Sequence, residues 1–381
     1  MVKSIQRKFS LHPASCTPYP QRPRRGFTLV ELLVVITIIG ILAALITVAA
    51  IGALKKSRQA QIKAELNQIA TAVDDYKNKT TAYPPNCQTD GPAANTLDEQ
   101  SILTDLRRHV KQIAPRSQED DALVARLAGL TTATPPAQLA GTGQLAGGMT
   151  ADEAVVFWLG GFSPDPKYPI SADGGPSYVI TTIGDTANAK QDPIETRKFV
   201  FPFDVSRLGP RDNSGYFSGR YIEYTVTKNG LAQNRRINFW NYTPSKSDKP
   251  YLYFDTSRHP AGVVSGTSLL GTYDPPAATA LVVPPQIPLA VYAFKKRAEN
   301  ASSTTTTIPQ VQFVNPDKYQ IIHCGLANAW DETNFKRMST GLVATNRPDD
   351  YLLFPTGPFI GDIADAIVNF ASETKIEDAQ K

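Results

Sequence analysis

A long apolar run dominates the N-terminal part of the chain. Phe27 to Leu54 reads FTLVELLVVITIIGILAALITVAAIGAL and holds a single charge, Glu31, and no proline. An α-helix of this length would measure about 42 Å, against a hydrocarbon core of roughly 30 Å. The run therefore predicts a membrane-spanning helix over residues 27–54. A secretory signal peptide is the alternative, but its apolar region is usually only about 7 to 15 residues long.

The apolar pattern continues past this run with a different spacing. Apolar side chains recur at intervals of 4, 3, 4 and 3 residues, which marks one face of a helix. We expect the helix to extend over residues 55–80, to end near Asn78 before the Pro84-Pro85 pair, and to rest one face on a folded domain. The residues of this stripe are Ile62, Leu66, Ile69, Val73 and Tyr76.

Helical and then strand-like patterns follow. Thr96–Glu99 and Thr150–Glu153 have the spacing of capping boxes, and a third helix is expected from Asp120 to Leu130, so residues 86–165 are predicted to be helical. Residues 166–381 are expected to form a β-rich domain. The predicted strands are Ser177–Ile183, Lys198–Phe203, Arg220–Thr227, Arg235–Trp240, Pro250–Thr256, Leu289–Phe294, Val311–Val314, Lys318–His323 and Tyr351–Phe354. The fold class is α+β: a long N-terminal helix packed on an antiparallel sheet domain, with inserted short helices.

Composition and charge limit the classes of function that the chain can have. With 381 residues, 41% apolar and 19% charged, the chain fits a folded protein. Residues 1–26 hold six bases and no acid, whereas the remainder holds 33 bases and 35 acids, so the basic character belongs to the N-terminal arm and no nucleic-acid partner is expected. The unopposed bases of the N-terminal arm favour a cytoplasmic N-terminus. The residues directly before and directly after the span do not decide the orientation, because each side carries three bases. These bases are Arg22, Arg24 and Arg25 before it, and Lys55, Lys56 and Arg58 after it.

Glu31 is the chemically informative residue of the span. A carboxylate within an apolar helix costs about 2.5 to 3.5 kcal/mol on insertion scales and needs a partner. No Lys or Arg lies within one helical turn. The partner must therefore come from another chain, unless the group reaches the head-group level as an ordinary interfacial charge.

The residues around Glu31 carry a resemblance. Arg24-Arg25-Gly26 followed by Phe27-Thr28-Leu29-Val30-Glu31 is similar to the processing segment of type IV prepilins and type II secretion pseudopilins. The resemblance implies a pilin-like fold, a leader over residues 1–26, and cleavage by a prepilin peptidase between Gly26 and Phe27. It also implies N-methylation of Phe27, and a role for Glu31 in assembly through the Phe27 amine of a neighbouring subunit.

The C-terminal part resembles the major pseudopilins of the secretion G type. The segments concerned are Lys318–Ile322, Gly325, Asp349-Asp350 and Ile367–Phe370. In that family an acidic loop binds calcium, which is the one candidate cofactor here. Asn328 and Ala329 stand where an Asp-Gly pair is expected. The candidate ligands are Asp349, Asp350, Asp362 and Asp365. As an alternative, Asp362 and Asp365 are first-turn acids of a short helix that runs to Phe370.

Enzymatic interpretations find little support. The GxGxxA match at Gly141–Ala146 follows no strand. His323 and Cys324 are neighbours in a predicted strand and point to opposite faces, so they form no dyad. His109 and His259 are interpreted as surface residues. Three cysteines allow at most one bridge, Cys87 to Cys324, with two unpaired thiols as the alternative.

The expected function is that of a structural subunit of a type II secretion pseudopilus, not an enzyme. Its partners would be further copies, other pseudopilins, the prepilin peptidase, the inner-membrane secretion platform and membrane lipid. It would cross the inner membrane once, with the C-terminal domain periplasmic. The alternative is a type IV pilin-like adhesin or ligand-binding domain that uses a pilin anchor, with the middle region as its binding surface.

Overall fold

The structure, a computed structural model, describes residues 26–86, 97–128, 149–228, 230–257, 293–297, 311–327 and 353–380. The chain forms two compact units, Met1–Leu54 and Lys55–Lys381. We call the second one the globular unit. Helix α1, Leu29–Thr80, contributes residues to both units. It is the one helix in the described part of the chain that is long and apolar enough to cross a membrane.

The outer part of α1 confirms the predicted amphipathic extension. Ile62, Leu66, Ile69, Val73 and Tyr76 are all buried, as the spacing predicts. The helix ends at Thr80, two residues beyond the predicted position. Its end is closed by the amide of Thr81, which donates to the carbonyl of Lys77 at 2.7 Å. Thr81 itself has a φ of 67°, the left-handed conformation that often follows a helix.

Three shorter helices follow: α2 Leu97–Ile113, α3 Asp121–Leu127 and α4 Ala151–Leu159. Asp120 caps α3 by accepting from the amide of Ala122 at 2.8 Å, and α3 ends three residues before the predicted Leu130. The predicted box at α4 is present, because the amide of Thr150 donates to Glu153 Oε2 at 3.0 Å. Thr96, the first residue of the other predicted box, lies outside the described residues.

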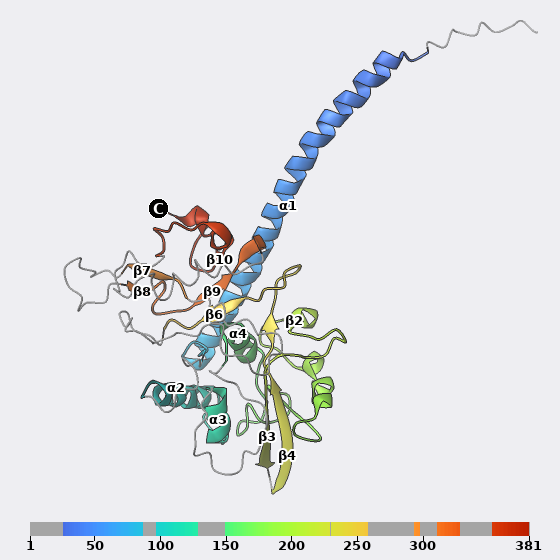
Figure 1. Cartoon of the computed structure of the whole chain (residues 1–381). Helices are drawn as coiled ribbons and strands as arrows, with labels where there is room; N and C mark the ends of the chain where they lie inside the picture. Colours follow the sequence, from blue (N-terminus) through green and yellow to red (C-terminus); the bar gives the residue numbers. More distant parts are fainter. Residues whose placement is uncertain are drawn as a thin grey trace, which may run out of the picture. The chain divides into compact units, whose positions relative to one another are not determined.

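Each pair of named strands in the described residues is antiparallel (Figure 1), whereas the isolated bridge between Lys295 and Leu353 is parallel. The first sheet, in the order β1-β4-β3, contains β1 Ser177–Val179, β3 Tyr221–Lys228 and β4 Leu231–Asn238. The second, in the order β10-β9-β6, contains β6 Leu252–Phe254, β9 Gln320–His323 and β10 Ile367–Val368. Two pairs complete the strands: β2 Leu208–Gly209 with β5 Asn241–Tyr242, and β7 Lys295–Arg297 with β8 Val311–Phe313.

Short 3₁₀ helices connect these elements. They are η1 Thr186–Gln191, η2 Ile194–Thr196, η3 Val205–Arg207, η4 Gly325–Ala327, η6 Gly361–Asp365 and η7 Glu377–Ala379. A long N-terminal helix, short helices and antiparallel sheets together confirm the predicted α+β class.

One predicted strand, Lys198–Phe203, is wrong, and half of another, Tyr351–Phe354, lies outside the described residues. Lys198–Phe203 is irregular, because Pro202 has no amide hydrogen and the amides of Val200 and Phe201 both donate to the Leu159 carbonyl at the end of α4. Tyr351–Phe354 is represented in the described residues only by isolated bridges of Leu353. Of the predicted strand Leu289–Phe294, the first four residues lie outside the described part, and Ala293 and Phe294 precede β7.

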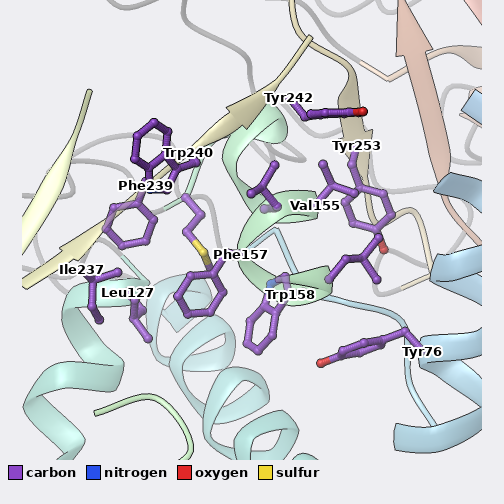
Figure 2. Close-up of a cluster of buried hydrophobic side chains, with 14 of the residues drawn as sticks. Tyr76, Leu127, Val155, Phe157, Trp158, Ile237, Phe239, Trp240, Tyr242 and Tyr253 are labelled. Atoms are coloured by element: carbon purple, nitrogen blue, oxygen red, sulfur yellow. The ribbon is translucent and has the colours of Figure 1, made fainter. Parts of the chain in front are cut away.

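Helices and both sheets contribute to a first hydrophobic cluster (Figure 2), and a second cluster contains residues of β6, β9, β10 and η6. Phe157 of α4 stacks on Phe239 at a centroid distance of 5.9 Å, and Trp158 meets Tyr76 of α1 edge-on at 6.5 Å. The indole of Trp158 also donates to the Pro85 carbonyl at 2.8 Å. Because α4 contacts both α1 and the residue that follows β4, and residues of α2 and α3 lie in the same cluster, the described helices of residues 86–165 are part of the globular unit's core.

His109 corrects a prediction. It is fully buried, not a surface residue, and its Nε2 lies 2.8 Å from the hydroxyl of Tyr76. Its ring stacks on Tyr76 and meets the edge of Trp158 at a centroid distance of 4.9 Å. The spacing contains the reason, since His109 lies three residues after the buried Leu106, on the inner face of α2.

Asp152, in the first turn of α4, makes the stability of the globular unit depend on pH. The side chain is buried and accepts from Thr150 Oγ1 at 2.5 Å and from Asn241 Nδ2 at 3.1 Å. Burial, and after it the neighbouring Glu153, raise the pKa of Asp152 to about 6.

We predict that Asp152→Asn stabilises the globular unit at pH 7. A carboxyl group whose pKa rises from 3.8 to about 6 on folding favours the folded state below the lower value, and this contribution is lost as pH rises through the upper one. The difference between the two values corresponds to about 3 kcal/mol. Urea unfolding of residues 55–381 should show the variant to be more stable by up to that amount, with the gap closing toward pH 4. A gap that does not change with pH would contradict the assignment.

Candidate functional site

The first turn of α1 is organised by Thr28 and Glu31. The amide and the hydroxyl of Thr28 both donate to Glu31 Oε2, each at 2.9 Å. The amide of Glu31 in turn donates to Thr28 Oγ1 at 3.2 Å. This is a capping box, which satisfies helix-end donors and places an acid where the helix dipole favours it.

Thr28 is the residue of this first turn whose contact with Glu31 the sequence analysis does not predict. Its T-x-x-E spacing is the same signal that marks the start of α4, and it supplies Glu31 with hydrogen-bond donors that are neither Lys nor Arg. Hydrogen bonds from Thr28 satisfy Oε2 but leave the negative charge in place. Glu31 Oε1 makes no hydrogen bond within the described part of the chain, so it is open to a second donor.

The peptide bond between Gly26 and Phe27 lies in an open segment. Residues 26–28 have no regular secondary structure before α1 begins at Leu29. Phe27 is 74% exposed. A Cβ atom added at Gly26 would meet no atom within 4 Å. The apolar side chains that follow are likewise exposed, which leaves a bare hydrocarbon surface for lipid or other helices.

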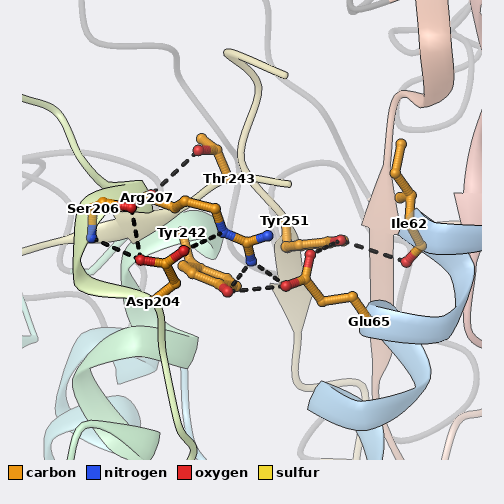
Figure 3. A network of polar contacts seen from close by, with 8 residues as sticks. All are labelled: Ile62, Glu65, Asp204, Ser206, Arg207, Tyr242, Thr243 and Tyr251. Carbon is orange, nitrogen blue, oxygen red and sulfur yellow. Dashed lines mark hydrogen bonds and ion pairs between the residues drawn. The ribbon is translucent and has the colours of Figure 1, made fainter. Parts of the chain in front are cut away.

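A polar network fixes the outer part of α1 within the globular unit (Figure 3). Glu65 of α1 accepts from Tyr242 Oη at 2.9 Å through Oε1 and from Tyr251 Oη at 2.8 Å through Oε2. Arg207, at the end of η3, pairs with Glu65 and lies over the Tyr242 ring at 4.3 Å from its centroid. Burial, and then the Glu65 charge, raise the pKa of Tyr251, so its hydroxyl stays a donor at neutral pH.

The C-terminal segment is attached to the same helix. Lys63 Nζ donates to the carbonyls of Val368 and Ala371 at 2.5 and 2.6 Å, and burial lowers the pKa of this amine. Tyr319, just before β9, donates from its hydroxyl to the Ala70 carbonyl at 2.7 Å. The helix is therefore held by polar contacts on both sides of Glu65.

The predicted C-terminal signature residues meet in the second sheet. Asn369 continues the β9–β10 pairing, because its amide donates to the Ile321 carbonyl at 3.1 Å and its side-chain oxygen accepts from the Ile321 amide at 2.9 Å. Phe370 packs on Phe294 and Phe354. Gly325 has a φ of 79°, and a Cβ atom there would lie 2.0 Å from the Asp365 carbonyl oxygen. Only glycine fits this close approach.

The predicted calcium ligands are only partly covered by the structure. Asp349 and Asp350 lie outside the described residues. Asp362 and Asp365 belong to η6, and Asp365 Oδ1 lies 3.6 Å from Lys375 Nζ. The alternative of a helix running to Phe370 is wrong, because η6 ends at Asp365 and β10 follows at Ile367. The described residues contain no group of three or more His, Cys, Asp or Glu arranged to hold a metal.

The environment of His323 argues against a catalytic base. Its Nδ1 accepts from the Gly325 amide at 3.0 Å, which puts the ring proton on Nε2, 3.2 Å from the Lys249 carbonyl. Burial lowers the pKa of His323 to about 4. Ser247 Oγ, 3.2 Å from Nε2, therefore faces a nitrogen that has no free lone pair for its proton. The Gly141–Ala146 motif and His259 lie outside the described residues.

Cys324 is a buried thiol whose pKa burial raises to about 12, so it stays in the unreactive protonated form. The proposed bridge to Cys87 remains a prediction, because Cys87 lies outside the described residues.

Comparison with known proteins finds a family model that matches the N-terminal segment. The family model described as the prokaryotic N-terminal methylation motif matches residues 21–47, which include Gly26, Phe27, Thr28 and Glu31. Over this segment the chain is similar to proteins that carry the prokaryotic N-terminal methylation motif. The match coincides with the open peptide bond, the capping box and the exposed apolar helix.

Several curated pseudopilins align with the chain, each named type II secretion system core protein G. The one from Pseudomonas aeruginosa is 38% identical over 68 residues, which are 18% of this chain and 48% of the relative. Those from Aeromonas hydrophila and Pectobacterium carotovorum are 30% and 29% identical, over 28% and 27% of this chain and 66% and 59% of the relatives. The chain thus spans about half to two thirds of these pseudopilins. No solved structure matches it significantly.

Proposed function

We propose that this protein is a structural subunit of a type II secretion pseudopilus. The observation that carries the proposal is the methylation-motif match over residues 21–47, on a segment whose described part forms an exposed apolar helix with a capped acid at its start. In this proposal the prepilin peptidase removes residues 1–26, and the Phe27 amine is methylated. The helix then bundles with those of further copies and of other pseudopilins on the inner-membrane platform. The activity is assembly rather than catalysis.

The orientation follows from charge. The six bases of the N-terminal arm stay on the cytoplasmic side of the inner membrane, and the globular unit lies on the periplasmic side. In this topology the cleavage site faces the cytoplasm before processing, and a single helix anchors the subunit until it assembles.

Glu31 pairs with the amine that processing creates. A free α-amine has a pKa near 8, so it is mostly protonated at neutral pH, and the positive end of the helix dipole disfavours it on its own subunit. A carboxylate on a neighbouring subunit supplies the counter-charge. The Thr28 box holds Glu31 near the helix start and leaves Oε1 to accept this donor.

We predict a mature chain that begins with N-methylated Phe27. Intact-mass analysis of the membrane-extracted protein should show the loss of residues 1–26 plus one methyl group. Gly26→Val should block cleavage without disturbing the fold, because the position has open space around it. Gly40→Ala, an equally open position on α1, is the matched control and should be processed. A chain that starts elsewhere, or a processed Gly26→Val variant, refutes the assignment.

We predict that Glu31→Gln abolishes assembly while membrane insertion is retained. Glutamine keeps an oxygen for the two Thr28 donors but removes the charge, which hydrocarbon disfavours, so insertion is retained. Thr28→Val is the complementary variant, since it weakens the cap and keeps the charge, so it should assemble better than Glu31→Gln. Filaments are scored by shear release and insertion by alkaline extraction. Wild-type assembly of Glu31→Gln would show that Glu31 is an ordinary interfacial charge.

We also predict calcium binding by Asp349, Asp350, Asp362 and Asp365. Calcium takes six to eight oxygen ligands, which these carboxylates and nearby carbonyls can supply. A ligand that binds only the folded state adds about 2.7 kcal/mol at 100 times its dissociation constant. Melting curves of residues 55–381 in millimolar calcium and in excess chelator should therefore differ, and the difference should vanish in Asp362→Asn/Asp365→Asn. Coincident curves for the wild type would exclude the site.

A further inference from the structure

Three basic residues follow the apolar segment of α1 and have no partner in the described part of the chain. Lys55, Lys56 and Arg58 are exposed and form no hydrogen bond or ion pair there. No acid occurs on the helix between Glu31 and Glu65, and Glu65 is already paired with Arg207. The next base, Lys63, is also engaged, by the carbonyls of Val368 and Ala371. Positive charge is thus concentrated at one level of the helix without compensation.

The arrangement of the three bases forms a partial belt. At 3.6 residues per turn and 1.5 Å per residue, they lie within about 4.5 Å of helix axis and point to three different sides. They directly follow a stretch from Leu32 to Leu54 without any charge. They also precede Ile62, the first residue of the buried stripe. The belt therefore occupies the short exposed length between the apolar segment and the part of α1 that packs in the globular unit.

The positive-inside rule makes this position unusual. With the N-terminus cytoplasmic, Lys55, Lys56 and Arg58 lie on the exported side, where that rule finds fewer bases. Anionic head groups attract bases at the membrane surface with about 1 kcal/mol each. The side chains have long apolar stems, which allow the charged ends to reach the phosphate level beside an inserted helix.

We propose that Lys55, Lys56 and Arg58 form a binding surface for the phosphate groups of anionic phospholipids in the periplasmic leaflet of the inner membrane. The occupant is lipid, because the belt adjoins the fully exposed apolar segment that lipid covers in the unassembled subunit. The inference rests on the membrane anchorage in the proposed function but not on processing or filament formation. The belt holds the subunit at a defined depth, and assembly then requires these phosphates to be released.

The test measures lipid selectivity around the full-length protein in reconstituted vesicles. Electron spin resonance compares the motionally restricted fractions of spin-labelled phosphatidylglycerol and phosphatidylcholine. The wild type should restrict more phosphatidylglycerol, and high salt should reduce the excess. Lys55→Gln/Lys56→Gln/Arg58→Gln should reduce it to the level of phosphatidylcholine. The control Lys79→Gln/Lys167→Gln/Lys198→Gln removes the same charge from exposed positions elsewhere and should keep the excess.

Two outcomes overturn the proposal. Equal restriction of both lipids by the wild type excludes a phosphate-binding belt, and equal loss of selectivity in both triple variants assigns the effect to net charge alone. In the first case, loss of filament assembly in the belt variant would identify carboxylates of a neighbouring subunit as the partner instead. If alkaline carbonate extracts the wild-type protein, the membrane anchor itself is absent. That result contradicts the proposed function and is distinct from a failure of the lipid-binding proposal.

Discussion

The globular unit depends on the burial of one face of α1. Ile62, Leu66, Ile69, Val73 and Tyr76 contribute to a core that also contains residues of α4 and of both sheets. Replacing one such side chain by alanine typically costs about 2 to 5 kcal/mol, which is a large part of the stability of an ordinary domain. The helix is thus a structural element of the folded unit, and its apolar continuation is the anchor.

Those parts of the fold that repeat a simple period could be predicted from the sequence. The stripe on α1, the box at Thr150 and the strand before Gly325 each follow from local rules, and the structure confirms them. Lys198–Phe203 was predicted as a strand because its aromatic residues suggest one, yet its amides find their acceptor at the end of α4. That acceptor comes from tertiary structure and is invisible in the local pattern. His109 was misplaced for a related reason, since the type of residue was weighed above its position on the inner face of α2.

Some residues of the candidate site could likewise be predicted from the sequence, and others could not. Gly26, Phe27 and Glu31 could be named from the sequence because the motif is short and contiguous. Thr28 has a signal of equal strength, but it was overlooked because a charge in an apolar helix directs attention to opposite charges. The network of Glu65, Arg207, Tyr242 and Tyr251 could not be foreseen, because its members come from distant parts of the sequence. The relatives align with less than a third of the chain, so most of the elements that hold α1 have no aligned counterpart in them.

The neighbouring positions of Lys63 and Glu65 have a mechanical consequence. These two side chains leave α1 within about one turn of each other and attach it to different parts of the fold, the C-terminal segment and the β2–β5 region. A force on this part of α1 would therefore act on both attachments. Resistance to forced unfolding is a matter of the unfolding rate rather than of equilibrium stability. The globular unit is thus attached to residues 55–80 of α1 at two separate places of the fold.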